Sequence, residues 1–158
     1  MMSLTKKALL DKLDQLFTKD MPFMKQFSAR TEFFDEHRVL LRFAMDKGLV
    51  GNTMSYILHG GAIATMLDTV GGMLTMAAVF AKNPDESEEA QRARLAKTST
   101  VNLLINYLRP GIDKSGGDFI AEARVVRCGS RITVCEMKLK DSESVLLASA
   151  TGTYMNGT

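Results

Sequence analysis

The sequence predicts an α+β domain in which one long central helix is wrapped by a curved, mostly antiparallel sheet. The first observation is an apolar stretch over residues 60–81, in which Asp68 is the only formally charged residue. A helix that is hydrophobic on every side must be buried or must span a membrane. The second observation is the order of elements: two predicted strands precede this helix and four follow it, which favours antiparallel pairing around it.

The chain before the central helix predicts a helical extension over residues 1–20, and the main domain covers residues 21–158. Ser3 can cap the extension, which carries apolar residues on one face and lysines on the other. Two strands and a loop then lead into the central helix. The strands cover residues 29–34 and 38–45, and the loop covers residues 46–58.

The chain after the central helix predicts a second helix and four strands. Asn83-Pro84-Asp85-Glu86 is typical of a helix start, with Asn83 as the cap. In the first of these strands the residues alternate, which places Thr100 on the polar side. The apolar side carries Val101, Leu103, Ile105 and Tyr107. The four strands cover residues 98–107, 119–127, 131–140 and 145–155.

Gly71 and Gly72 stand in the middle of the apolar helix. Each glycine costs about 1 kcal/mol relative to alanine in a helix interior. This cost indicates that a strand, a partner's helix or a ligand approaches the helix closely at this point.

The composition excludes several classes of function. The net charge of +2 does not suggest a nucleic-acid partner, and the two cysteines have no metal-ligand spacing, so we expect two free thiols and no metal site. Residues 1–20 lack the apolar core of an export signal, and we expect a cytoplasmic protein. A membrane span over residues 60–81 is the main rival reading. It would place Asp68 in hydrocarbon at a cost of roughly 3 kcal/mol, so we expect no membrane insertion.

Three blocks of sequence carry a family resemblance. They are the His59-Gly60-Gly61 to Asp68 segment with Asn52 upstream, residues 100–111, and residues 148–155. The chain resembles the hotdog-fold acyl-CoA thioesterases of the PaaI-like branch, and most closely the YigI-like proteins within it, over about residues 20–156.

This resemblance implies hydrolysis of a fatty acyl-CoA thioester, without a cofactor beyond the coenzyme A of the substrate. It implies that Asp68 is the base or nucleophile and that the Gly60 N–H polarises the thioester carbonyl. It also implies supporting roles for His59, Asn52 and a hydroxyl at Thr100, at the interface of a homodimer that often pairs into a tetramer. Many relatives carry a glycine three residues before the histidine, where this chain has Tyr56.

The chemistry of a thioester fits a small set of groups. A thiolate leaves readily because the pKa of a thiol is about 8.5, so one base or nucleophile and an oxyanion donor suffice. If the helix includes His59, the nine residues to Asp68 turn through about 900°, so the two side chains point to opposite sides. The sequence therefore predicts composite sites formed by two chains. On this reading Thr100, opposite the apolar strand face, could act only where that face meets a partner.

Further residues are candidate contacts for the substrate. Met66 either lines an acyl tunnel or belongs to the ordinary core, and Arg109 and Arg131 are candidates for the phosphates of coenzyme A. The complete set of expected contacts is Gly61, Thr69, Met66, Arg109 and Arg131.

Two other functions are compatible with parts of the pattern. A non-catalytic acyl-CoA-binding module would use the same cleft without turnover. A hotdog enoyl-CoA hydratase or dehydratase would need a histidine and carboxylate spacing that this chain lacks. Turnover of an acyl-CoA panel, with and without the Asp68 carboxylate, distinguishes these functions from a thioesterase.

Overall fold

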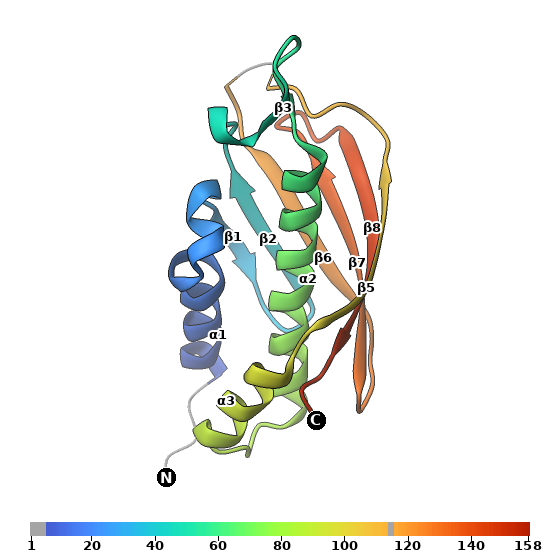
Figure 1. Cartoon of the computed structure of the whole chain (residues 1–158). Coiled ribbons are helices and arrows are strands. Elements are labelled where there is room, and N and C mark those ends of the chain that lie inside the picture. The colour runs from blue at the N-terminus through green and yellow to red at the C-terminus, as the bar shows by residue number, and fades with distance from the viewer. Residues whose placement is uncertain (1–5, 114–115) are drawn as a thin grey trace.

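The apolar stretch forms α2 (Gly60–Lys82), which packs against one face of a six-stranded sheet (Figure 1). This computed structural model describes residues 6–113 and 116–158, so the predicted Ser3 cap lies outside the described residues. All neighbouring strands of the sheet pair antiparallel. In spatial order the strands are β1 (Arg30–Phe34), β2 (Arg38–Phe43), β6 (Phe119–Cys128), β7 (Ile132–Lys140), β8 (Leu146–Met155) and β5 (Thr100–Tyr107). The predicted α+β class, with a central helix and a mostly antiparallel sheet, is confirmed.

The remaining elements flank α2. A second, two-stranded sheet lies in the segment that enters α2, where the sequence predicted only a loop. Near the N-terminus a helix continues into a π-helical turn and then a 3₁₀ helix, and another helix follows α2 (Figure 1). These elements are α1 (Lys6–Gln15), the π turn Leu16–Asp20, the 3₁₀ helices Pro22–Phe27 and Lys47–Leu49, β3 (Val50–Asn52), β4 (Ile57–Leu58) and α3 (Glu88–Lys97).

The start of α3 corrects one prediction. The helix begins at Glu88, after Ser87, whose hydroxyl accepts a hydrogen bond from the Ala90 N–H. Asn83 is not its cap, because Asn83 ends α2 and donates its side-chain amide to the carbonyl of Val79 at 2.7 Å. Asn and Ser side chains can both cap a helix. Because α2 extends to Lys82, Asn83 lies at the end of α2, and Ser87 caps the start of α3.

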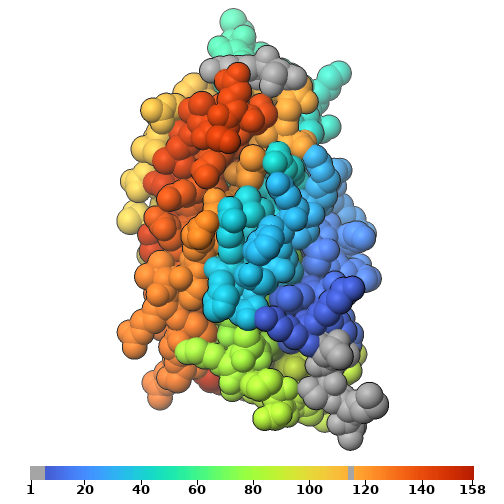
Figure 2. Space-filling view, turned by 180° about the vertical axis from the view of Figure 1, so that it is seen from behind, coloured from blue at the N-terminus to red at the C-terminus, as the bar shows by residue number. Residues whose placement is uncertain are grey.

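The core lies between α2 and the sheet. Alternate residues of β2, namely Val39, Leu41 and Phe43, are fully buried against it, and the other face of the strand carries Arg38, Leu40 and Arg42. Figure 2 shows this outer face, with β5 along one margin and β1 and β2 toward the other. The length and composition of α2 would allow it to cross a membrane, but 72% of its most apolar window is buried within the fold. That burial is expected of the core helix of a domain.

The two cysteines are unpaired, as predicted. Cys135 is buried against α2, and this burial raises the pKa of its thiol to about 11. Cys128 is half-buried at the end of β6.

Candidate active site

Asp68 lies in the third turn of α2, beside a cavity of about 390 Å³. The walls of this cavity are mainly apolar and come from the N-terminal segment, α2, α3, the start of β5 and Tyr154 of β8. The Asp68 side chain is half-buried. It therefore keeps access to a ligand or to water while lying among hydrocarbon side chains. We call this space the Asp68 cavity.

Thr100 is hydrogen-bonded to the Asp68 carboxylate. Its hydroxyl lies 3.0 Å from Oδ1 and 3.2 Å from Oδ2 of the same chain. Because the hydroxyl donates to the carboxylate, it limits the orientations of the Asp68 side chain. Thr100 thus acts on Asp68 without help from a partner chain.

This position corrects the predicted face of Thr100. The pairing of β5 with β8 skips Val101, so that Thr100 lies opposite Tyr154 and Asn102 lies opposite Thr153. A bulge of this kind inserts one residue and shifts every side chain beyond it to the other face. Thr100 therefore shares the face of Leu103 and Ile105, which is the face toward α2. Val101, which the alternation placed on that face, is 57% exposed.

Tyr154 forms the floor beneath Asp68. Its side chain is 1% exposed, and its hydroxyl lies 3.4 Å from the backbone carbonyl of Asp68. Burial, followed by the negative charge of Asp68, raises the pKa of the Tyr154 hydroxyl far above its usual value, so it stays protonated. A Cβ on Gly71 would lie only 2.0 Å from the Tyr154 hydroxyl. The close approach expected at Gly71 is thus made by the side chain of a strand residue.

The Gly60 N–H, which the resemblance implies as the donor to the thioester carbonyl, lies at the first turn of α2. His59 caps the helix, because its Nδ1 accepts a hydrogen bond from the Gly61 N–H at 2.7 Å. The His59 ring must therefore carry its proton on Nε2 in this arrangement. The Gly60 N–H belongs to the first residue of the helix and has no acceptor within it.

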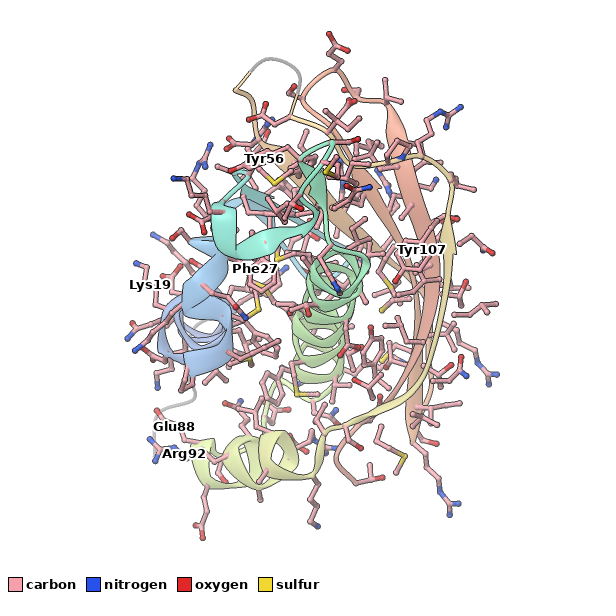
Figure 3. The ribbon with its side chains drawn as sticks, turned by 45° about the horizontal axis from the view of Figure 1, so that its top comes forward. Lys19, Phe27, Tyr56, Glu88, Arg92 and Tyr107 are labelled. Carbon is pink, nitrogen blue, oxygen red and sulfur yellow. The ribbon has the colours of Figure 1, made fainter. Side chains whose placement is uncertain are left out.

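Tyr107 closes this end of the helix from β5. Its hydroxyl donates to the Gly60 carbonyl at 3.0 Å, and Figure 3 shows its side chain beside the start of α2. Sequence reasoning placed Tyr107 on the apolar strand face without giving it a role. β5 therefore touches α2 near both functional groups, with Thr100 at Asp68 and Tyr107 at Gly60.

The two groups are far apart within one chain. Eight residues separate Gly60 from Asp68, which is about 12 Å along the helix axis. A thioester carbonyl held by the Gly60 N–H therefore lies beyond the reach of the Asp68 of the same chain. His59 precedes the helix, so the angular argument made from the sequence does not apply, and the axial distance takes its place.

Asn52 has a local structural role. Its side-chain oxygen accepts hydrogen bonds from the N–H groups of Met54 and Ser55, which shapes the turn between β3 and β4. Tyr56 in that turn has a φ of 50°, which is the left-handed region that glycine adopts most easily. Tyr56 thus adopts a backbone conformation that a glycine at this position would adopt without strain.

The expected substrate contacts lie in different places. Thr69 lines the Asp68 cavity, whereas Met66 is fully buried in the core and does not line it. Arg109 and Arg131 are exposed at opposite ends of β8, about 30 Å apart by strand length. Gly61 is exposed at the helix start, and its N–H serves the His59 cap. Across residues 6–113 and 116–158, no cluster of three His, Cys, Asp or Glu side chains could hold a metal ion.

Several residues of the cavity gave no signal in the sequence. Phe17, Met21 and Leu95 line it from the N-terminal segment and from α3. Their apolar character predicts burial but not the neighbour that they bury against. Met76 of α2 also lines the cavity.

Comparisons with known proteins place this chain and its fold in a family. The Thioesterase superfamily model matches residues 56–148. The medium/long-chain acyl-CoA thioesterase YigI of Escherichia coli (strain K12) is 33% identical, with 98% of this chain and 97% of YigI covered. A Shewanella oneidensis crystal structure related to the thioesterase superfamily has a TM-score of 0.89 at 33% identity, covering 96% of this chain and 97% of its own. A putative thioesterase from Syntrophus aciditrophicus has a TM-score of 0.83 at 26% identity, with the same coverage.

With a helix-borne carboxylate beneath an antiparallel hotdog sheet, the chain belongs to the thioesterase superfamily. Within that superfamily it is an enzyme, a thioester hydrolase similar to YigI along almost its whole length. The resemblance to hotdog thioesterases and to their YigI-like members is thereby confirmed.

Proposed function

We propose that this enzyme hydrolyses medium- to long-chain fatty acyl-CoA thioesters to the free acid and coenzyme A. The observation that carries the proposal is the Asp68 cavity, in which one carboxylate faces mainly apolar walls. Its volume of about 390 Å³ lies within the range typical of small-molecule sites. The named activity of the YigI relatives supports the same substrate class.

The reaction needs few groups and no cofactor. In one route Asp68 takes a proton from water while the water oxygen bonds to the thioester carbon, the C–S bond breaks, and the proton passes to the departing thiolate. In the other route a carboxylate oxygen of Asp68 attacks that carbon and releases the thiolate, and water then hydrolyses the mixed anhydride. In both routes the Gly60 N–H stabilises the negative charge that develops on the carbonyl oxygen.

A homodimer would bring these groups together. β5 is an edge strand of the sheet, and Val101, Leu104 and Tyr107 on it are 57%, 63% and 54% exposed. An apolar edge strand is a template for pairing with another chain. We propose that a second copy of this chain pairs there, antiparallel and about a two-fold axis.

The register of this pairing follows from the contacts of β5. An axis passing near Leu103 and Leu104 puts Tyr107 of the partner subunit opposite Thr100. Because Thr100 holds Asp68 and Tyr107 holds Gly60, the same register brings Gly60 of the partner subunit to Asp68. Each of the two sites is then composite, which accounts for the 12 Å separation within one chain.

The test is release of thiol from a panel of acyl-CoA substrates, followed with a chromogenic disulfide. Asp68→Asn should lower kcat by about 10²-fold or more, because it removes the base or nucleophile and retains the shape of the side chain. Glu89→Gln, which neutralises an exposed carboxylate on α3, is the matched control and should leave kcat unchanged.

The protein's own cysteine thiols can react with the chromogenic disulfide, and this background must be subtracted. The Cys135 thiol, whose pKa burial raises to about 11, stays protonated at the pH of the assay, so Cys128 sets the background. Full turnover by Asp68→Asn would contradict the role of Asp68. Tight acyl-CoA binding without turnover by the unaltered enzyme would contradict the proposed function, and hydration of crotonyl-CoA would favour a hydratase.

A further inference from the structure

One face of α2 continues from Asp68 toward the C-terminal end of the helix. Gly72, Met76 and Phe80 follow Asp68 at intervals of four residues, and this spacing puts them on the same side of the helix. Gly72 and Met76 line the Asp68 cavity. Phe80 lines the next cavity along the helix.

This second cavity lies between α1 and α3 and has a volume of about 240 Å³. Leu16 and Leu95 line both cavities and therefore stand at their border. Beyond the border, Leu9 and Leu13 of α1 face Phe80. We call the second cavity the distal groove.

Charged side chains lie along the rim of the distal groove. Lys12 of α1 pairs with Glu88 of α3 at 3.5 Å, and Arg92 lies one turn after Glu88 (Figure 3). The groove is therefore apolar inside and polar where it meets water. A chemically featureless hydrocarbon chain fits such a groove better than a polar ligand does.

The length of the path matches that of a long acyl chain. Asp68 and Phe80 are twelve residues apart, which is about 18 Å along α2. The hydrocarbon of a bilayer is about 30 Å thick and holds two layers of acyl chains, so one long chain reaches about 15 Å. A short chain would end within the Asp68 cavity, before Leu16 and Leu95.

We propose that the acyl chain of the substrate runs from Asp68 along this face of α2 into the distal groove, and that Leu16 and Leu95 control its passage from the Asp68 cavity into that groove. This inference rests on the proposed function, because it takes the thioester carbon to lie at Asp68. Each methylene buried beyond the border should then raise kcat/KM by up to about 4-fold.

The experiment is a chain-length profile of kcat/KM from butanoyl-CoA through octanoyl-CoA to myristoyl-CoA, the last kept below its micellar concentration. Leu16→Trp and Leu95→Trp fill the border from opposite walls. Each should lower kcat/KM for myristoyl-CoA by about 10-fold or more, as expected when several methylenes lose their site. Octanoyl-CoA should change less than about 2-fold, since burial of its chain is retained. Ala93→Trp, on the exposed side of α3, is the matched control and should leave the whole profile unchanged.

The outcomes separate this inference from the proposed function. If the unaltered enzyme hydrolyses no acyl-CoA, the proposed function is wrong whatever the variants do. If it hydrolyses the panel and both border variants lower all chain lengths equally, the proposal for the groove is overturned. A preference of the unaltered enzyme for butanoyl-CoA also overturns it. Leu16→Ala, which widens the border without adding bulk, should shift the chain-length optimum of kcat/KM to longer chains. An unchanged optimum would contradict the proposed role of Leu16.

Discussion

The hydroxyl of Thr100 is the side-chain donor that the structure places on the Asp68 carboxylate, at 3.0 and 3.2 Å from its two oxygens. A donor shared between both oxygens fixes the plane of the carboxylate. It also balances part of the charge that an apolar wall would otherwise leave uncompensated. On the proposed function, Asp68 reacts while Thr100 and Tyr154 hold it in position.

Thr100→Val should lower kcat by about 10-fold with little change in KM, because the lost hydrogen bond orients the reacting group rather than the substrate. Thr100→Ser should restore most of the rate, since it keeps the donor. Steady-state kinetics on octanoyl-CoA measures both. A change confined to KM in Thr100→Val would instead place Thr100 in substrate binding.

At the scale of elements, the two adjacent glycines of α2 differ in how closely their neighbours pack. A Cβ on Gly71 would collide with the buried Tyr154 ring, whereas a Cβ on Gly72 would lie 3.7 Å from Phe17, which is ordinary contact. The neighbouring glycines share the same propensity cost. Packing on the two sides of the helix makes only the first of them necessary.

Gly71→Ala should destabilise the fold by about 2–4 kcal/mol, as expected for overpacking in a rigid core. Gly72→Ala is the matched control, and its higher helix propensity should make it neutral or stabilising by up to about 1 kcal/mol. Urea denaturation followed by circular dichroism gives both values. Equal effects of the two substitutions would contradict the packing of Tyr154 against Gly71.

The outer face of the sheet carries a buried carboxylate that is held by ion pairs. Glu122 on β6 is buried among Arg38, Arg124 and Lys140, with oxygen–nitrogen distances of 2.8, 2.9 and 3.4 Å. Burial alone would raise the pKa of Glu122. The hydrogen bond from Arg124 and the charges of Arg38 and Lys140 outweigh it, and they hold that pKa below 4.5.

A folded-state pKa below the unfolded value stabilises the protein above pH 4.5, and this contribution is lost as the pH falls below it. Glu122→Gln should therefore lower the free energy of unfolding at pH 7, and its difference from the unaltered protein should shrink toward pH 3. Glu136→Gln on the same face, where the carboxylate is half exposed, should show a much smaller effect. A difference that is constant with pH would rule out this ion cluster as its source.

At the scale of the whole molecule, the proposed dimer ties the two halves of the site together. Leu104→Asp would place a carboxylate on each side of the proposed axis, and should produce a monomer with kcat/KM lowered by about 10²-fold, as for loss of an oxyanion donor. Light scattering after gel filtration and the thiol-release assay measure the two effects. Val126→Asp, at a site on β6 that is 64% exposed, is the control. An active monomer of Leu104→Asp would contradict the composite site.

The sequence by itself determined the central helix, the strands around it, Asp68 as the reactive carboxylate candidate and the family. These follow from local periodicity, from one unusual charge in an apolar helix, and from a motif of adjacent residues. Tertiary structure alone decided that Thr100 faces Asp68, that Tyr154 fills the space over Gly71, and that α1 and α3 enclose a groove beyond the cavity. A bulge depends on pairing with β8, and a groove depends on which distant elements meet. Neither is encoded in the spacing of residues along one strand or helix.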